Sequence, residues 1–233
     1  RFGPSATVYG IDPWLDGLEY AKQKAELLNI SNIRLLKQYA ENLSFDDAFF
    51  DCIVSNNGLN NVQNIDMALL ECARVAKPDA QLAFAMYTNE SMKEFYDVFE
   101  QVLESYGLEI SILAMQNHVA DEKKSISQIE SKLNKFGFRL ISKIEDTFYL
   151  RFLDGTALLN HHFIRQVFYP VWHALVVEGH QKQVFELLES KLNLLAKLNG
   201  ELKLAIQFVV FDCEKPRKHL SLSTVKLLLS SHR

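Results

Sequence analysis

Short apolar runs alternate with amphipathic stretches over the first 86 residues of this chain. The strand-like runs are residues 6–11, 33–36, 52–55 and 81–86. Residues 13–28 and 65–76 instead place apolar side chains at helical spacing, and Pro78 is expected to end the second helix. Short apolar runs are typical of buried parallel strands. Strands that alternate with single helices therefore predict an α/β fold built on a parallel sheet.

The rhythm changes after Met86. Capping boxes that begin at Ser91 and Ser127 predict two helix starts, and Gly137 predicts a helix end. The further predicted elements are strands at 138–144, 147–152 and 202–211, and helices at 155–177 and 180–198. We expect the last strands to close the same sheet. The expected organisation is a single domain, residues 1–213, with insertions at 88–124 and 154–200 and a tail at 214–233.

Composition excludes several classes of protein. The 233 residues are 48% hydrophobic and 23% charged with a net charge of −4, which is typical of a globular protein. The charges form no basic stripe and no apolar run could span a bilayer, so we expect neither a nucleic-acid nor a membrane partner. Cys52, Cys72 and Cys213 lack metal-ligand spacing. They predict buried free thiols, a reducing cytoplasmic location and no metal site.

A string of short motifs carries a resemblance to a known family. The motifs are Val8-Tyr9-Gly10-Ile11-Asp12, Phe50-Asp51-Cys52-Ile53-Val54-Ser55-Asn56-Asn57 and Glu71-Cys72-Ala73-Arg74-Val75-Ala76-Lys77-Pro78. Residues 7–86 resemble class I S-adenosylmethionine-dependent methyltransferases of the type 11, ubiquinone-biosynthesis-like group. The resemblance implies a Rossmann-like sheet, mostly parallel, with an antiparallel strand near the carboxyl terminus. It also implies S-adenosyl-L-methionine as cofactor and a small-molecule methyl acceptor.

The resemblance also implies which residues contact the cofactor. Asp12 matches the family's acidic residue that accepts hydrogen bonds from both ribose hydroxyls. The other matching positions are Pro13 and Trp14 against the adenine, the backbone of Ala40 and Glu41 beside it, and Asn56 and Asn57 at the methionine end. Each position has a structural alternative. Asp12 could cap the following helix, Trp14 could be an ordinary aromatic residue, and the asparagines could serve a left-handed turn.

Three departures from the family pattern stand out. Tyr39 occupies the position of the acid that receives the adenine amino group, and Asp79-Ala80 replaces a glycine pair after Lys77-Pro78. None of the nine glycines forms the Gly-rich loop of the family. We therefore expect the family's first strand and Gly loop to be missing. As a fragment, the chain is expected to bind S-adenosylmethionine weakly or not at all, and its activity is in doubt.

Methyl transfer from a sulfonium needs mainly alignment of the acceptor, so the family has no fixed catalytic motif. His161 and His162 are candidate proton acceptors, and His118 and His180 are further ones. The alternative for His161 and His162 is a helix with one exposed and one core-edge histidine. An aromatic set could line an acceptor pocket or form core: Tyr87, Phe95, Tyr96 and Phe99.

Other functions stay open at this point. The chain could be a non-catalytic binding or regulatory protein of methyltransferase fold, because Tyr39 and the absent Gly loop both fit lost chemistry. In NAD-binding folds an acid at the position of Asp12 also binds the ribose, so an NAD-binding oxidoreductase is a second alternative. A protein-methylating enzyme is a third. The methyl acceptor and the oligomeric state do not follow from the sequence.

Overall fold

The computed structural model describes residues 3, 5–122 and 125–217 and contains two compact units. The first unit consists of Arg1–Phe84, Glu130–Lys143 and Phe211–Arg233, and the second of Ala85–Ile129 and Ile144–Val210. Three strands run from one unit into the other, so the chain crosses between them several times. The single domain expected over residues 1–213 stays a prediction.

The strands lie at bounds close to those expected in the first third of the chain. The strands are β1 (Val8–Asp12), β2 (Ile33–Lys37), β3 (Phe50–Asn56), β4 (Ala76–Tyr87), β5 (Arg139–Phe152) and β6 (Leu202–Glu214). The helices up to β5 are α1 (Leu15–Leu27), the short η1 (Gly58–Asn60), α2 (Ile65–Val75), α3 (Lys93–Ser105), α4 (Glu109–Glu122) and α5 (Ile126–Lys135). The later helices are α6 (Gly155–Asn160), α7 (His162–Val167), α8 (Tyr169–Ala174) and α9 (Gln181–Asn199).

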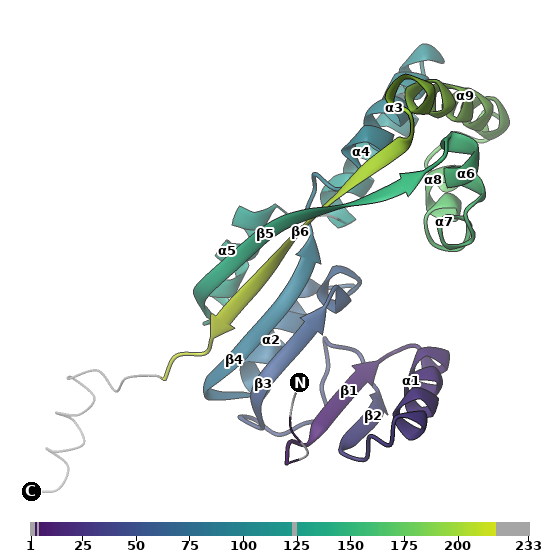
Figure 1. Cartoon of the computed structure of the whole chain (residues 1–233). Coiled ribbons are helices and arrows are strands. Elements are labelled where there is room, and N and C mark those ends of the chain that lie inside the picture. The colour runs from purple at the N-terminus through teal and green to yellow at the C-terminus, as the bar shows by residue number, and fades with distance from the viewer. Residues whose placement is uncertain (1–2, 4, 123–124, 218–233) are drawn as a thin grey trace, which may run out of the picture. The chain divides into compact units, whose positions relative to one another are not determined.

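The strands form two separate ladders (Figure 1). β1 and β2 pair in parallel, with Val8 opposite Ile33 and Asp12 opposite Lys37. The other ladder has the order β3-β4-β6-β5. In that ladder β6 runs antiparallel to β4, because the N–H of Asp79 donates to the carbonyl of Lys215 near one end and the N–H of Thr88 donates to the carbonyl of Gln207 near the other. The mixed α/β architecture and the antiparallel strand near the carboxyl terminus are therefore confirmed. The expected single sheet is not seen, because the last strands join a ladder that does not include β1 and β2.

Several expected boundaries were wrong after residue 86. The two strands expected at 138–144 and 147–152 form one continuous strand, β5, whose outward side chains are largely exposed and lack apolar alternation. The helix expected over 155–177 is divided into α6, α7 and α8, because His161 adopts an extended conformation between the first two. Helix α4 was not expected, since its apolar side chains do not gather on one face.

Both predicted capping boxes were misplaced. Met92, not Ser91, is the N-cap of α3, and the hydroxyl of Ser91 donates to the carbonyl of Gln207. The capping box of α5 begins at Ser125 instead of Ser127. There the Ser125 hydroxyl accepts from the N–H of Gln128, whose side chain accepts from the N–H of Ser125. The structure describes the tail expected from residue 214 as far as residue 217, and the terminal helix suggested for residues 220–233 lies outside the described residues.

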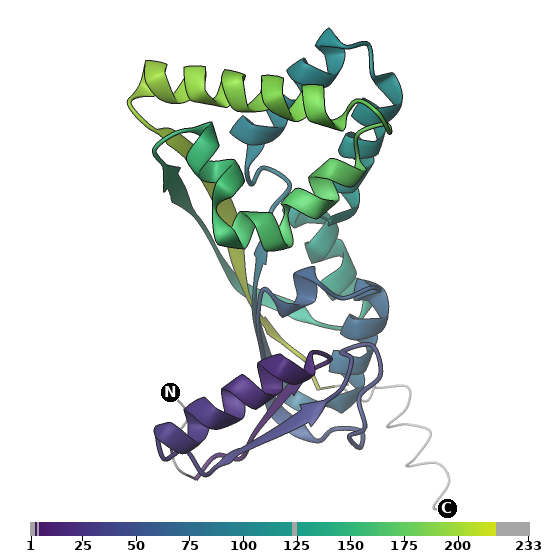
Figure 2. The same cartoon turned by 90° about the vertical axis from the view of Figure 1, so that its right-hand side faces the viewer.

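The core of the second unit is aromatic and helical. Phe95, Phe99 and Trp172 are fully buried in one cluster with side chains of α9. Helix α9 packs against α3 and α6 (Figure 2). The indole of Trp172 stacks on Phe95 with ring centroids 4.0 Å apart, and its N–H donates to the hydroxyl of Tyr96 over 3.2 Å. The predicted stripe of Phe95, Tyr96 and Phe99 is thus core. Tyr96 also contributes to the wall of a cavity of about 540 Å³ between α3 and α4.

The first unit packs α2 and α5 on its strands. Its fully buried side chains include Leu69 on α2, Leu133 on α5, and Phe84 and Phe211, which stack with centroids 5.0 Å apart. Each such side chain stabilises the fold by about 1.5–3 kcal/mol relative to an exposed one. Within residues 3, 5–122 and 125–217, no helix is both long and apolar enough to cross a membrane.

Candidate functional site

Asp12 is the last residue of β1, where the strand leaves the ladder. One carboxylate oxygen, Oδ1, accepts a hydrogen bond from the backbone N–H of Trp14 over 2.8 Å. Among the described residues, no group contacts the second oxygen. The expected helix cap is thus correct in part, since one oxygen holds the turn into α1. The other oxygen stays available to an external donor.

Pro13 and Trp14 follow at the surface. Trp14 is the N-cap of α1, and 65% of its surface is exposed. Its ring lies over Gly17, where an added Cβ would approach the ring to 2.7 Å, so only glycine leaves room for this ring position. A large, flat and exposed aromatic side chain two residues after Asp12 suits stacking against a planar ring.

The loop of residues 38–49 begins beside Asp12. The N–H of Gln38 donates to the carbonyl of Asp12 over 3.3 Å, and Tyr39 pairs with Asn42 in a short antiparallel bridge. Tyr39 stands 54% exposed, and Ala40 and Glu41 are half-buried. The end of β1 and the segment with Ala40 and Glu41 therefore lie at the same edge of the ladder.

The side chain of Glu41 makes a link that sequence reasoning missed. Its Oε1 accepts from the N–H of Gln63 over 2.7 Å and from the N–H of Asn64 over 3.2 Å. Asn64 is the N-cap of α2. Glu41 thereby ties the loop of residues 38–49 to the segment between η1 and α2. Nothing in the spacing of these residues signals a contact made across 22 positions of sequence.

Asn56 and Asn57 follow β3. Asn57 adopts a left-handed conformation with φ 57°, which agrees with the alternative that the asparagines serve a left-handed turn. Its side-chain N–H donates to Oδ1 of Asn56. Oδ1 of Asn57 and Oδ1 of Asn60 are buried, and among the described residues neither has a hydrogen-bond partner. Buried acceptors without a partner are costly, so a hydrogen-bond donor that reached these two oxygens would be stabilising.

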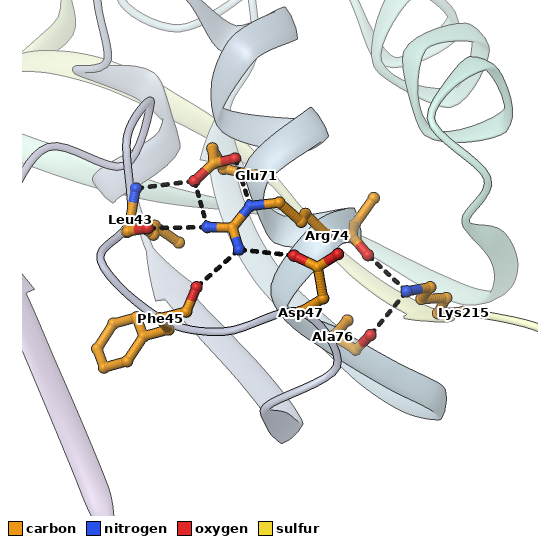
Figure 3. Close-up of polar contacts among 8 residues, drawn as sticks. Leu43, Phe45, Asp47, Glu71, Arg74, Ala76 and Lys215 are labelled. Carbon is orange, nitrogen blue, oxygen red and sulfur yellow. Dashed lines mark hydrogen bonds and ion pairs between the residues drawn. The ribbon is translucent and has the colours of Figure 1, made fainter.

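Glu71 and Arg74, one helical turn apart on α2, form the densest polar cluster of the first unit (Figure 3). The guanidinium donates to both Glu71 oxygens, to the carbonyls of Leu43 and Phe45, and to Asp47. Glu71 also accepts from the N–H of Leu43 over 2.8 Å. The i, i+3 spacing of the two charges was a visible signal for an ion pair, but not for its backbone targets.

The pKa of Glu71 lies below its ordinary value, first because Arg74 donates hydrogen bonds to it and also because Leu43 does. A depressed folded-state pKa adds stability above the ordinary value of 4.5, and this stability is lost as the pH falls through the folded-state pKa. We expect Glu71→Gln to lower the free energy of unfolding by about 1–3 kcal/mol at neutral pH. The difference from the wild type should shrink below pH 4.5.

Urea denaturation at a series of pH values from neutral to acidic checks this prediction. Glu19→Gln on α1, which changes an exposed acid, is the control and should leave the dependence of the free energy of unfolding on pH unchanged. The prediction would be contradicted if the difference in free energy of unfolding between the wild type and Glu71→Gln stayed constant down to acidic pH.

Asp79 occupies the position where the family pattern has glycine. Its φ is 63°, so the backbone takes the left-handed conformation that glycine would favour, and the carboxylate pairs with Arg217. Pro78 does not end α2, which stops at Val75 and continues directly into β4. Lys215 donates to the carbonyls of Ala73 and Ala76 and so satisfies the end of the helix (Figure 3).

The candidate histidines lie in the second unit. His161 and His162 are both exposed, and the ring of His161 contacts Phe152 edge to face at 5.6 Å. His118 lies on α4, not in the loop expected, and His180 precedes α9 with a buried Nδ1 that has no partner among the described residues. Their part in proton transfer stays a prediction.

The three thiols are free. Cys72 and Cys213 are buried, and burial raises the pKa of each to about 12. Cys52 is half-buried, and its pKa is also raised, again mainly by burial. Raised pKa values keep the thiols protonated and unreactive at neutral pH. In the part of the chain that the structure describes, no three His, Cys, Asp or Glu side chains are placed to hold a metal ion.

Comparison with known proteins finds a similarity to methyltransferases in the first part of the chain. A family model described as a methyltransferase domain matches residues 1–84. A demethylmenaquinone methyltransferase of Geobacillus sp. is 35% identical over 80 residues, which cover 34% of each chain. That of Lactobacillus johnsonii is 28% identical over 154 residues, which cover 62% of this chain and 63% of that protein.

The matched part of the chain thus spans 34% to 63% of the length of these two methyltransferases. The fold extends the likeness further. The YcgJ protein of Bacillus subtilis superposes with a TM-score of 0.56 over 93% of this chain and 86% of its own, at 16% identity. The chain therefore has a Rossmann-like α/β fold.

Proposed function

We propose that this chain is part of an S-adenosylmethionine-dependent methyltransferase that acts on a small molecule. The observation that carries the proposal is the free oxygen of Asp12 at the end of β1. A carboxylate with an unused acceptor, next to an exposed aromatic ring, suits a ribose with an attached planar base. The bound cofactor would supply an activated methyl group on a sulfonium.

The residues present fit other parts of this cofactor. Ala40 and Glu41 would lie beside the base, because their loop begins at the carbonyl of Asp12. The buried oxygens of Asn57 and Asn60 lack donors among the described residues, and the ammonium of the methionine end is a donor of the right kind. Glu41 contributes its backbone and uses its carboxylate to hold the neighbouring segment.

The relatives support a small aromatic acceptor. The two matched proteins are demethylmenaquinone methyltransferases, so we propose a quinone-type ring as the acceptor of this protein.

The proposal is tested by titrating the isotope-labelled chain with S-adenosylhomocysteine and following backbone amide resonances. Because the 233 residues include no Gly-rich loop, we expect weak binding and use millimolar ligand. Resonances of Asp12, Trp14, Ala40, Glu41 and Asn57 should shift. NAD, titrated in parallel, should leave them unchanged. Shifts with NAD alone, or none with either ligand, would overturn the proposal.

A further inference from the structure

Glu71 and Arg74 are not among the proposed contact residues. They form hydrogen bonds to the backbone of the loop of residues 38–49, which carries two proposed contact residues, Ala40 and Glu41. We propose that this pair positions the loop of residues 38–49 for the base of the cofactor. The inference rests on the proposed function, since it assigns a positioning role toward the same site. It concerns side chains that hold the loop from α2 and need not touch the ligand.

The contacts end on backbone atoms of the loop, which is what positioning requires. Arg74 donates to the carbonyl of Leu43 over 2.8 Å and to that of Phe45 over 2.7 Å, while Glu71 accepts from the N–H of Leu43. Both peptide groups of Leu43 are thus held, only two residues after Glu41 (Figure 3). Charge-assisted bonds to backbone fix the path of the chain whatever the side chains at those positions are.

The loop is also braced so that a shift at Leu43 reaches the proposed site. Within the loop, the side chain of Gln38 donates to the Ser44 hydroxyl over 2.6 Å and accepts from the Ser44 N–H over 3.1 Å. The ring of Phe45 contacts Tyr9 of β1 at 5.2 Å. Because Tyr9 precedes Asp12 by three residues on the same strand, the grip on Phe45 also fixes the loop relative to the proposed ribose contact.

An ordinary surface ion pair of the same unit provides a contrast. Lys77 and Asp51 form an ion pair over 2.7 Å, their side chains are 42% and 83% exposed, and this contact joins two side chains without involving the backbone. Glu71 is 14% exposed and Arg74 30%. Exposed pairs contribute little, whereas a partly buried fork that holds backbone constrains geometry. Lys77→Met is therefore the matched control for Arg74→Met.

The experiment follows the affinity of S-adenosylhomocysteine and the amide shifts in Arg74→Met, Arg74→Lys and Glu71→Gln. We expect Arg74→Met to bind about tenfold more weakly, because the loop would no longer be held in the position that contacts the base. Shifts at Ala40 and Glu41 should vanish while those at Asp12 and Trp14 remain. Arg74→Lys should bind more tightly than Arg74→Met, because lysine keeps the positive charge, and more weakly than the wild type, because it lacks the planar set of donors of the guanidinium. Lys77→Met should match the wild type.

The outcomes separate the two hypotheses. A wild type without shifts ends the proposed function and this inference with it. A wild type that binds, with Arg74→Met binding equally well and keeping the shifts at Ala40 and Glu41, overturns the positioning role alone. If Arg74→Met loses the dispersed spectrum of a folded protein, Arg74→Lys and Glu71→Gln decide the question by the same two readings.

Discussion

Replacing Trp172 with alanine is expected to lower the free energy of unfolding by about 3–5 kcal/mol, the largest effect on stability among the substitutions considered. Trp172 is fully buried in the second unit and stacks between Phe95 and Phe168. Its removal leaves a cavity among aromatic rings that cannot collapse onto one another. It also takes the hydrogen-bond donor away from the hydroxyl of Tyr96.

Chemical denaturation followed by circular dichroism measures this loss. The chain offers a matched control in its only other tryptophan, because Trp14 is 65% exposed. Trp14→Ala should change stability by no more than about 0.5 kcal/mol. Trp172→Phe should lie between, since it keeps most of the ring and loses the N–H. Equal effects of Trp14→Ala and Trp172→Ala would show that the core is not organised around Trp172.

Replacing Asp12 with alanine is expected to weaken binding of S-adenosylhomocysteine by about tenfold to a hundredfold. The reason is the loss of charge-assisted hydrogen bonds to the ribose, worth about 1.5–3 kcal/mol in all. The same substitution also removes the acceptor for the N–H of Trp14, so alanine alone does not separate binding from local structure.

Asp12→Asn makes that separation. Asparagine keeps an oxygen that can accept from Trp14 and replaces the free acceptor with a donor. We therefore expect Asp12→Asn to fold like the wild type and to bind nearly as poorly as Asp12→Ala. Asp16→Ala, an exposed acid on the first turn of α1, is the control and should bind normally. Wild-type affinity in Asp12→Asn would show that the residue serves only the turn into α1.

The first third of the fold was readable from the sequence because its elements are local. β1, α1, β2, β3 and α2 were expected within a few residues of their bounds, since strand and helix periods are written directly in neighbouring side chains. α4 and the breaks between α6, α7 and α8 were missed. Their side chains are sorted by contacts with distant helices rather than by a clean local period.

The candidate site divides in the same way. The sequence by itself determined that an acid ends β1, that an asparagine turn follows β3 and that the strands are apolar, because each depends on residues next to one another in the chain. Only the tertiary structure decided which polar groups are already used. Glu41 is taken up by the segment before α2, and Arg74 by the carbonyls of Leu43 and Phe45. Hydrogen bonds between residues more than twenty positions apart depend on how the chain folds back, which no spacing in the sequence records.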